Sequence, residues 1–437
     1  MLRAAIPTAL HHRSFRLLWL GLLFSMTGTS MQSAAVLWHV NELSGIPIAL
    51  GGVGLVRILP ILVLSLFAGA AVDAFNRRHL ILITQTCMAL LAALLGWVTL
   101  RGLDSIWLIY VIIAASSAIS AFDLPARQSL VPNLVPRDVL TNAFSLTSIA
   151  SQFGLIVGPA IGGIILAEAG IAYSYFINAI SFLAVIAALI FMGPVPQKRQ
   201  DILLKSMGSR SMSSHRSKQN TTTLMTAVKQ GLSFVRHEPI ILSSMLLDFF
   251  ATFFSSATFL LPIFAKEILA VGVKGYGLLI AAPAFGAGII AIIFSFRKII
   301  RRQGPVLLIA VSGFGLSTIL FGFSRSFWLT FFALVMTGVT DSVSAIIRST
   351  MRQLQTPDHL RGRMTSVNQI FFRGGPQLGE LEAGIIGQWL GVPFAVVSGG
   401  IGCLLAAAWI AIRFPQLRHY QGSESRATGY PAANSKK

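Results

Sequence analysis

Residues 48–78 read IALGGVGLVRILPILVLSLFAGAAVDAFNRR, a long apolar run that ends in a short basic turn. The apolar run, residues 48–72, contains a single charged side chain, Arg57, and the turn contains Asp73, Arg77 and Arg78. A helix of about 20 apolar residues crosses the hydrocarbon core of a bilayer. The stretch therefore predicts a transmembrane helix followed by a turn at the membrane surface.

The same alternation of apolar runs and short polar connections extends along all 437 residues. The chain is 54% hydrophobic and only 11% charged, whereas soluble domains have about 25% charged residues. Its mean hydropathy is +0.74. Twelve transmembrane helices are predicted, at 15–38, 48–72, 79–100, 106–124, 142–167, 172–193, 240–265, 275–296, 305–323, 327–347, 364–390 and 392–413.

Lysine and arginine are distributed unequally between the two sets of connecting segments. With the N-terminus placed in the cytoplasm, the inside segments hold 28 of the 34 cations and the outside segments hold 4. Because cytoplasmic loops carry the excess of positive charge, this pattern predicts twelve spans with both termini cytoplasmic. It explains most of the net charge of +19. It also argues against a nucleic-acid-binding protein, whose cations gather on one face of a soluble fold.

The sequence divides into two halves of six predicted helices. The expected parts are an N-terminal bundle at 1–193, a cytoplasmic linker at 194–239 with an amphipathic surface helix, a C-terminal bundle at 240–414 and a cytoplasmic tail at 415–437. Arg127 precedes Pro136, and Arg348 precedes Pro357, by the same nine positions after the fourth helix of each half. Internal repeats of this kind are typical of transporters whose halves rock around a central site.

The turn after the second predicted helix carries a specific motif. It resembles the loop signature of the major facilitator superfamily, Gly-x-x-x-Asp-Arg-x-Gly-Arg-Arg, at four positions: Gly69, Asp73, Arg77 and Arg78. Two positions depart from the signature, because Ala74 replaces an arginine and Asn76 replaces a glycine. Asparagine tolerates a left-handed backbone, so the turn itself can survive. Without the resemblance, the same residues are equally compatible with a solvated basic turn.

The resemblance implies an all-α membrane protein with two six-helix bundles around a central cavity and transport by alternating access. It also implies a conformational switch in which the Arg77 cation pairs with an acid at the cytoplasmic end of the fourth helix. Asp123 occupies that place here. Such a pair stabilises the outward-open state in the family, and loss of the arginine at Ala74 removes part of the charge network.

The fifth predicted helix contains glycines that share one face and a proline that can bend it. These positions are Gly154, Gly158, Pro159, Gly162 and Gly163. Ordinary helix packing explains the glycine face. The run Gly-Pro-x-x-Gly-Gly also resembles the signature of the superfamily's drug antiporters, which implies export by exchange. The match is partial, because Ser145 stands where that signature has a further glycine.

Three further stretches narrow the resemblance. They are residues 125–138 with Asn142 and Ala143, residues 231–236, and residues 357–364. Together they resemble the branch that contains enterobactin exporters and macrolide-efflux proteins, over nearly the whole chain. The resemblance implies a location in the bacterial inner membrane.

Ionisable residues inside apolar spans are costly, and they mark substrate or proton pathways unless they form interhelical ion pairs. The candidates for substrate binding or proton coupling are Arg57, Asp248, Arg373, Glu380 and Glu382. Glu380 lies about two turns beyond Arg373 and can share its side of the helix, whereas Glu382 is rotated away. Asp341 is a weaker candidate, because it lies nearer the cytoplasmic end.

The sequence thus predicts a monomeric secondary transporter that exports a drug-like compound or a siderophore, with protons as the coupling ion and membrane lipid around it. No metal cluster, nucleophile–base pair or phosphate-cradling loop is recognisable, so we expect neither an enzyme nor a cofactor. A siderophore-specific exporter and a lysophospholipid transporter are alternatives. A non-transporting membrane sensor is an alternative of a different class.

Overall fold

The computed structural model describes residues 7–193, 233–254, 256–295, 302–356 and 361–422, and these residues form helices and short turns without a strand. The N-terminal half is built from six long helices. They are α1 (Arg13–Ser44), α2 (Pro47–Ala74), α3 (Arg77–Leu100), α4 (Ile106–Leu130), α5 (Leu140–Glu168) and α6 (Ile171–Met192). Short 3-10 turns η2 (Thr8–His11), η3 (Val131–Asn133) and η4 (Arg137–Val139) flank them.

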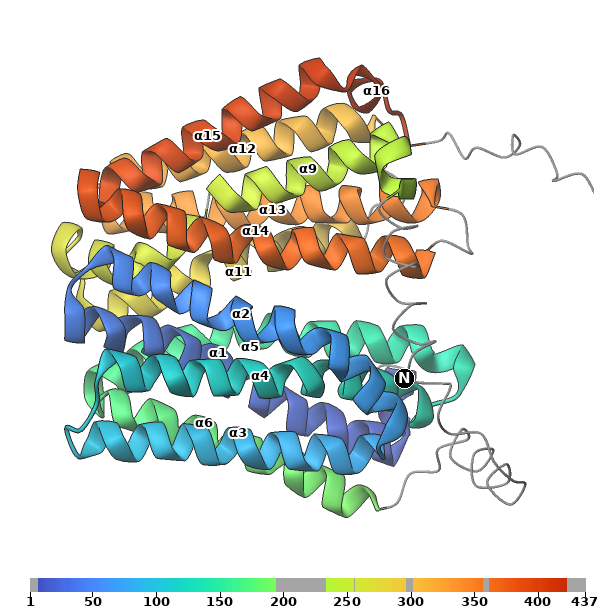
Figure 1. Ribbon diagram of the computed structural model, residues 1–437, viewed down its shortest axis with the longest axis vertical. Coiled ribbons are helices and arrows are strands. Elements are labelled where there is room, and N and C mark those ends of the chain that lie inside the picture. Colours follow the sequence, from blue (N-terminus) through green and yellow to red (C-terminus); the bar gives the residue numbers. More distant parts are fainter. Residues whose placement is uncertain (1–6, 194–232, 255, 296–301, 357–360, 423–437) are drawn as a thin grey trace, which may run out of the picture.

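The C-terminal half begins with α9 (Pro239–Phe254), η5 (Ser256–Leu260), α10 (Leu261–Ile263) and η6 (Phe264–Ile268). It continues with α11 (Gly272–Ser295), α12 (Gln303–Phe323), α13 (Phe327–Gln355), α14 (Arg361–Leu390), α15 (Val392–Arg413) and α16 (Pro415–Arg418). Figure 1 shows the helices of the two halves as two groups, with α2 and α5 of one group facing α14 and α11 of the other.

Ten helical stretches within the described ranges are long and apolar enough to cross a membrane. They coincide with ten of the twelve predicted spans. The other two predicted spans, 15–38 and 364–390, are also helical, as α1 with 32 residues and α14 with 30. Both contain charged, amide and hydroxyl residues within their sequences, so they are more polar than a typical apolar span.

The seventh predicted span coincides with the apolar helical stretch Pro239–Ile268, but that stretch is not one regular helix. A single helix was expected at 240–265, but α9 ends at Phe254, and the chain then passes through a 3-10 turn, one α-helical turn and the π-helical turn η6. Pro262 lies within this stretch, and a proline cannot donate the backbone hydrogen bond that an α-helix requires. The apolar pattern was visible in the sequence, and the interrupted hydrogen-bond ladder was not.

The tenth predicted span is too short. It was expected to end at residue 347, but α13 continues to Gln355 and carries Arg348 and Arg352 inside the helix. The predicted surface helix of the linker falls mostly on residues outside the described ranges. Residues 233–237 are helical, and Val235 packs with Ile241 and Met245.

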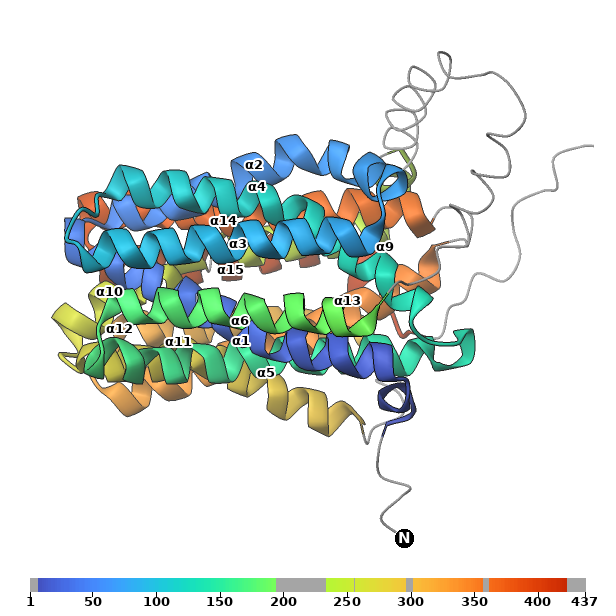
Figure 2. The same ribbon diagram turned by 90° about the horizontal axis from the view of Figure 1, so that it is seen from below.

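The long helices run side by side along one direction, so their turns gather at two ends (Figures 1 and 2). We call the closed end the one formed by the turns at 45–46, 101–105, 169–170, 269–271, 324–326 and 391. The four cations that the sequence places outside lie in or beside these turns: Arg101, Lys266, Lys274 and Arg325. Large apolar side chains such as Trp107, Trp389 and Ile412 are exposed on the helix surfaces, as in proteins solvated by lipid.

Within the N-terminal half, α5 crosses α1 with its backbone in close contact. A β-carbon at Gly154 would lie 2.9 Å from the carbonyl carbon of Met26, and one at Gly158 would lie 2.5 Å from the carbonyl oxygen of Thr27. Gly162 faces the side chain of Met31. The predicted glycine face of the fifth helix therefore has α1 as its partner, and this close approach requires residues without a side chain.

We predict that Gly158→Ala destabilises the protein, because the new methyl group collides with backbone that cannot rotate away. Overpacking of this kind costs about 1–3 kcal/mol. Thermal unfolding of the purified chain in detergent measures the effect. Gly288→Ala on α11 is the control, because a β-carbon there meets only Ile156 Cδ1 at 3.6 Å. Equal stability of the two variants would contradict the close α1–α5 crossing.

Candidate functional site

The two halves contact each other along two helix pairs, α2 with α14 and α5 with α11. A β-carbon at Gly163 would lie 2.8 Å from the Cα of Gly277, and one at Gly384 would lie 3.1 Å from the Cα of Gly51. Gly163 is therefore not part of the glycine face that packs on α1. It lies where α5 contacts α11 of the other half. Backbones of opposite halves touch at both crossings.

Side chains of both halves close the molecule next to these crossings. The hydroxyl of Tyr276 on α11 donates to the carbonyl oxygen of Ala34 on α1 at 2.9 Å, and its ring lies 5.2 Å from that of Trp38. Lys274 and Glu168 form an ion pair of 2.5 Å between α11 and α5. Ala34, Trp38 and Tyr276 belong to a buried apolar cluster that includes residues of both halves, whereas the Lys274–Glu168 pair is exposed. The structure is thus in a conformation sealed at the closed end.

A buried histidine fixes the N-terminal half beside this seal. His39 on α1 is 2% exposed, and its Nε2 lies 2.6 Å from Asp104 Oδ2 while its Nδ1 lies 3.0 Å from the hydroxyl of Tyr175. The three residues tie α1 to the α3–α4 turn and to α6. Sequence reasoning missed this cluster, since its members are far apart in the chain and His39 only follows the end of a predicted span.

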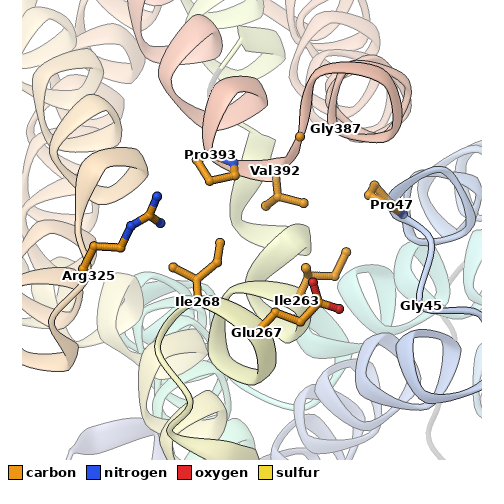
Figure 3. Close-up of a pocket in the computed structure, with 10 residues that line it drawn as sticks. Gly45, Pro47, Ile263, Glu267, Ile268, Arg325, Gly387, Val392 and Pro393 are labelled. Carbon is orange, nitrogen blue, oxygen red and sulfur yellow. The ribbon is translucent and has the colours of Figure 1, made fainter.

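A surface hollow of about 440 Å³ lies at the closed end where turns of the two halves meet. Figure 3 shows Glu267 of η6 and Arg325 of the α12–α13 turn pointing toward it, with Pro47 of α2 on another side. Ile268 and Val392 supply apolar surface. A gap therefore lies between the halves at the surface of the closed end. The buried contacts that seal this end lie deeper in the molecule.

We predict that Tyr276→Phe weakens the seal between the halves, because it removes one hydrogen bond between them. A larger fraction of molecules should then be open at the end that is sealed in this structure. A hydrogen bond contributes about 0.5–1.5 kcal/mol, so the ratio of open to closed molecules should rise about 2- to 10-fold. Spin labels at the exposed positions Leu103 and Phe323 measure the distance between the halves.

Tyr173→Phe is the matched control, because Tyr173 is exposed on α6, outside the seal. Its distance distribution should equal that of the wild type. A Tyr276→Phe distribution without an added long-distance population would refute the role of the hydrogen bond in the seal.

Asp123, the predicted partner of Arg77, is fully buried and has different partners in this structure. Its carboxylate forms an ion pair with Arg127, one turn along α4, and accepts hydrogen bonds from Thr84 Oγ1 at 2.7 Å and Gln85 Nε2 at 2.9 Å. Arg77 instead donates from Nη1 to the carbonyl oxygen of Ser129 at 2.9 Å. The predicted pair is therefore not formed in the conformation described.

The rest of the predicted switch is described in part. Arg78 donates from Nε to the carbonyl oxygen of Leu189 on α6 at 2.9 Å, and the side chain of Asn76 caps the first turn of α3. Gly69 and Asp73 belong to α2, but their side-chain environment lies outside the described residues. The described part of the turn thus anchors α3 to α4 and α6.

The C-terminal half contains a buried ion network around Asp248 of α9. Arg348 Nη2 lies 3.1 Å from Asp248 Oδ1 and 3.3 Å from Asp341 Oδ1, and Arg352 Nη1 lies 3.4 Å from Asp248 Oδ2. Arg352 also donates to Asn368 Oδ1 of α14 at 2.6 Å. Asp248, a candidate for substrate or proton binding, is thus held by two guanidinium groups.

From the sequence, Arg348 and Arg352 were expected in the cytoplasmic loop after the tenth span, because both were counted among the cations of that loop. A signal was present, since the two arginines are four residues apart and Asp341 precedes Arg348 by seven, so all three can share one helix face. The fourth helix of each half carries an arginine that pairs with a buried carboxylate. Arg127 of α4 pairs with Asp123 of the same helix, and Arg348 of α13 pairs with Asp248 of α9. The arginine repeat seen in the sequence therefore coincides with a structural correspondence.

We predict that Asp248→Asn strongly destabilises the protein, because it leaves two buried guanidinium groups without their shared counter-ion. Breaking a buried pair from one side typically costs about 3–5 kcal/mol. Thermal unfolding in detergent measures the loss. Adding Arg348→Gln to Asp248→Asn should recover part of the stability, and Asp138→Asn in the turn η4 should change nothing. A wild-type melting curve for Asp248→Asn would rule out the network as a structural element.

Glu380 lies in a different environment from Asp248. It is on α14 at the interface between the halves, where a β-carbon at Gly54 of α2 would lie 2.4 Å from its Oε2. No described residue forms a hydrogen bond with that buried oxygen. Arg57 follows Gly54 by three positions on α2, so it lies about one helical turn from the point where α2 meets Glu380. Arg57 and Glu380 thus belong to the same crossing of the two halves.

The remaining two candidates are not part of this pair. Glu382 is half-buried on another side of α14. Arg373 belongs to α14, but its side chain lies outside the described residues. Arg57 also borders a polar cavity of about 290 Å³ inside the N-terminal half. The interface of the halves and this cavity together form the candidate functional site.

Comparison with known proteins agrees with this architecture. A family model described as transmembrane secretion effector matches residues 5–434. The enterobactin exporter EntS of Escherichia coli K12 is 23% identical over 428 residues, which are 95% of this chain and 95% of that protein. The uncharacterised MFS-type transporter YfiS of Bacillus subtilis is 26% identical over 360 residues, or 79% of each chain.

Solved structures share the fold at low sequence identity. A bacterial homologue of the human lysosomal transporter Spinster, in an inward-facing and occupied conformation, has a TM-score of 0.68 at 14% identity. The match covers 94% of this chain and 98% of that one. A bacterial homologue of the iron transporter ferroportin, in an inward-facing state, has a TM-score of 0.67 at 16% identity and covers 92% and 98%.

Proposed function

The chain belongs to the transmembrane secretion effector family of major facilitator transporters, and on this premise we propose that it exports a small molecule by alternating access. The observation that carries the proposal is the contact between the halves. Glycine-lined crossings join them on either side of a seal at one end of the molecule. Rocking about such crossings would open one end while it closes the other.

The proposed topology has twelve transmembrane helices, because α1 and α14 lie among the ten apolar spans and contact them along their length. Both termini are cytoplasmic and the closed end faces outward, in keeping with the few cations at its turns. The protein would act as a monomer in the bacterial inner membrane. The conformation described here is then the inward-facing one.

Each half is proposed to move as a rigid unit. The Asp123 and Asp248 networks connect helices of the same half, so they hold that half together while the interface changes. In the outward-open state, Gly69, Asp73, Arg77 and Arg78 would latch the cytoplasmic side, with Arg77 approaching Asp123. The bend at Pro159 and the glycines of α5 would permit that helix to follow the motion.

Proton coupling is assigned to Glu380. Its carboxylate lies at the proposed moving interface and forms no ion pair among the described residues, whereas Asp248 forms ion pairs with two arginines. A proton entering from outside would neutralise Glu380, weaken its attraction to Arg57 and favour the exchange of cargo for the proton. Arg373 and Glu382 on the same helix are secondary candidates for this role.

We predict that Glu380→Gln abolishes the stimulation of transport by a pH gradient, because glutamine cannot carry the proton. Inverted membrane vesicles with an imposed gradient and a panel of ethidium, erythromycin and enterobactin measure it. Asp138→Asn should retain full stimulation. Wild-type transport that ignores the gradient would remove the proton role.

The cargo class is tested in the same assay. The similarity to the enterobactin exporter EntS favours a siderophore over a drug-like compound, and a lysophospholipid added to the panel covers the third alternative. Absence of flux for the whole panel from correctly folded wild-type protein would favour a membrane sensor.

A further inference from the structure

The cavity of about 290 Å³ lies within the N-terminal half, between α1, α2, α3, α4 and α6. It is comparable in size to the smaller pockets that bind organic ligands in proteins, which begin at about 300 Å³. The close-packed interior of a helix bundle has no structural need for a void of this volume, because unfilled space forfeits packing energy. We therefore expect a ligand to occupy this cavity.

The wall of the cavity is polar on one side. Arg57 on α2 and Gln32 on α1 border it, together with the hydroxyl groups of Ser116 and Ser120 on α4. The Gln32 carbonyl oxygen accepts a hydrogen bond from Asn178 Nδ2 at 2.6 Å, which leaves the Gln32 amino group as a donor toward a ligand. The remaining wall is apolar and includes Met88, Leu95, Ile113 and Phe182.

The charge of this wall is positive. Arg127 also borders the cavity, but its charge is compensated by the ion pair with Asp123. None of the described residues that border the cavity carries a carboxylate. Arg57 forms no ion pair among the described residues, and Glu380 of the other half meets α2 at Gly54, about one helical turn away. One guanidinium is thus available to a ligand inside an apolar and hydroxyl-lined space.

We infer that this cavity binds the anionic group of the cargo, and that Arg57 selects an organic anion with a carboxylate or a similar planar oxyanion on an apolar body. A guanidinium binds such groups through two parallel hydrogen bonds, and hydroxyl and amide donors complete their solvation. The apolar wall would hold the body of the molecule. The inference rests on the proposed export function and adds the chemical class of its cargo.

The test uses three naphthalene probes of similar size and different charge, 1-naphthoate, 1-naphthamide and 1-naphthylmethylamine, with the purified full-length chain in detergent and no gradient. Competition against tritiated 1-naphthoate measures their affinities. Wild type should prefer the anion over the neutral amide about 10- to 100-fold, the range expected for hydrogen bonds to a charged group. Arg57→Gln should reduce this preference to about threefold or less and still bind the amide, detected by thermal stabilisation.

Further variants separate charge, geometry and folding. Arg57→Lys should give an intermediate preference, because lysine retains the charge without the planar fork. Ser116→Leu should fill the cavity and weaken all three probes. Arg101→Gln in the α3–α4 turn is the matched arginine control and should behave as wild type.

The inference is overturned if no probe binds, if wild type does not distinguish the anion from the amide, or if the preference survives Arg57→Gln. Binding without flux in vesicles would leave the anion site in place and reject the export function. Flux of neutral or cationic compounds without an anion preference would retain export and reject the anion site.

Discussion

The architecture depends on backbone contact between helices that carry no side chain where they cross. In lipid, apolar side chains gain little from meeting each other, so helices associate through close packing and hydrogen bonds. Gly163 with Gly277 and Gly51 with Gly384 let the two halves touch at the backbone, and Gly158 does the same for α1 and α5. A contact with so few interlocking side chains holds two bodies together while allowing them to tilt.

The buried charges fall into two kinds according to how completely they are paired. Asp123 and Asp248 lie inside single halves and are surrounded by arginine, hydroxyl and amide donors. Glu380 and Arg57 lie on the helices where the halves meet, and neither forms an ion pair among the described residues. Since burying an incompletely solvated charge is costly, such a pair suits a place where partners change during function.

The sealed end shows why local sequence patterns could not reveal the gate. Tyr276 contacts Ala34 and Trp38, which precede it by 242 and 238 positions in the chain. His39 on α1 contacts Asp104 in the α3–α4 turn and Tyr175 on α6. No periodicity connects residues at such separations. The cavity beside Arg57 likewise combines side chains of five helices. Each of these residues appears, within its own helix, as an ordinary polar interruption of an apolar run.

The sequence by itself determined the membrane class, ten of the apolar spans, the division into halves of similar pattern and the family resemblance, because apolar run length and loop charge follow directly from the cost of placing polar groups in lipid. Only the tertiary structure decided which helices the glycines bring together, that α13 extends to include Arg348 and Arg352, and that Asp123 pairs with Arg127 in place of Arg77. Partner choice depends on distances between segments far apart in the chain. Those distances exist only after the helices have packed.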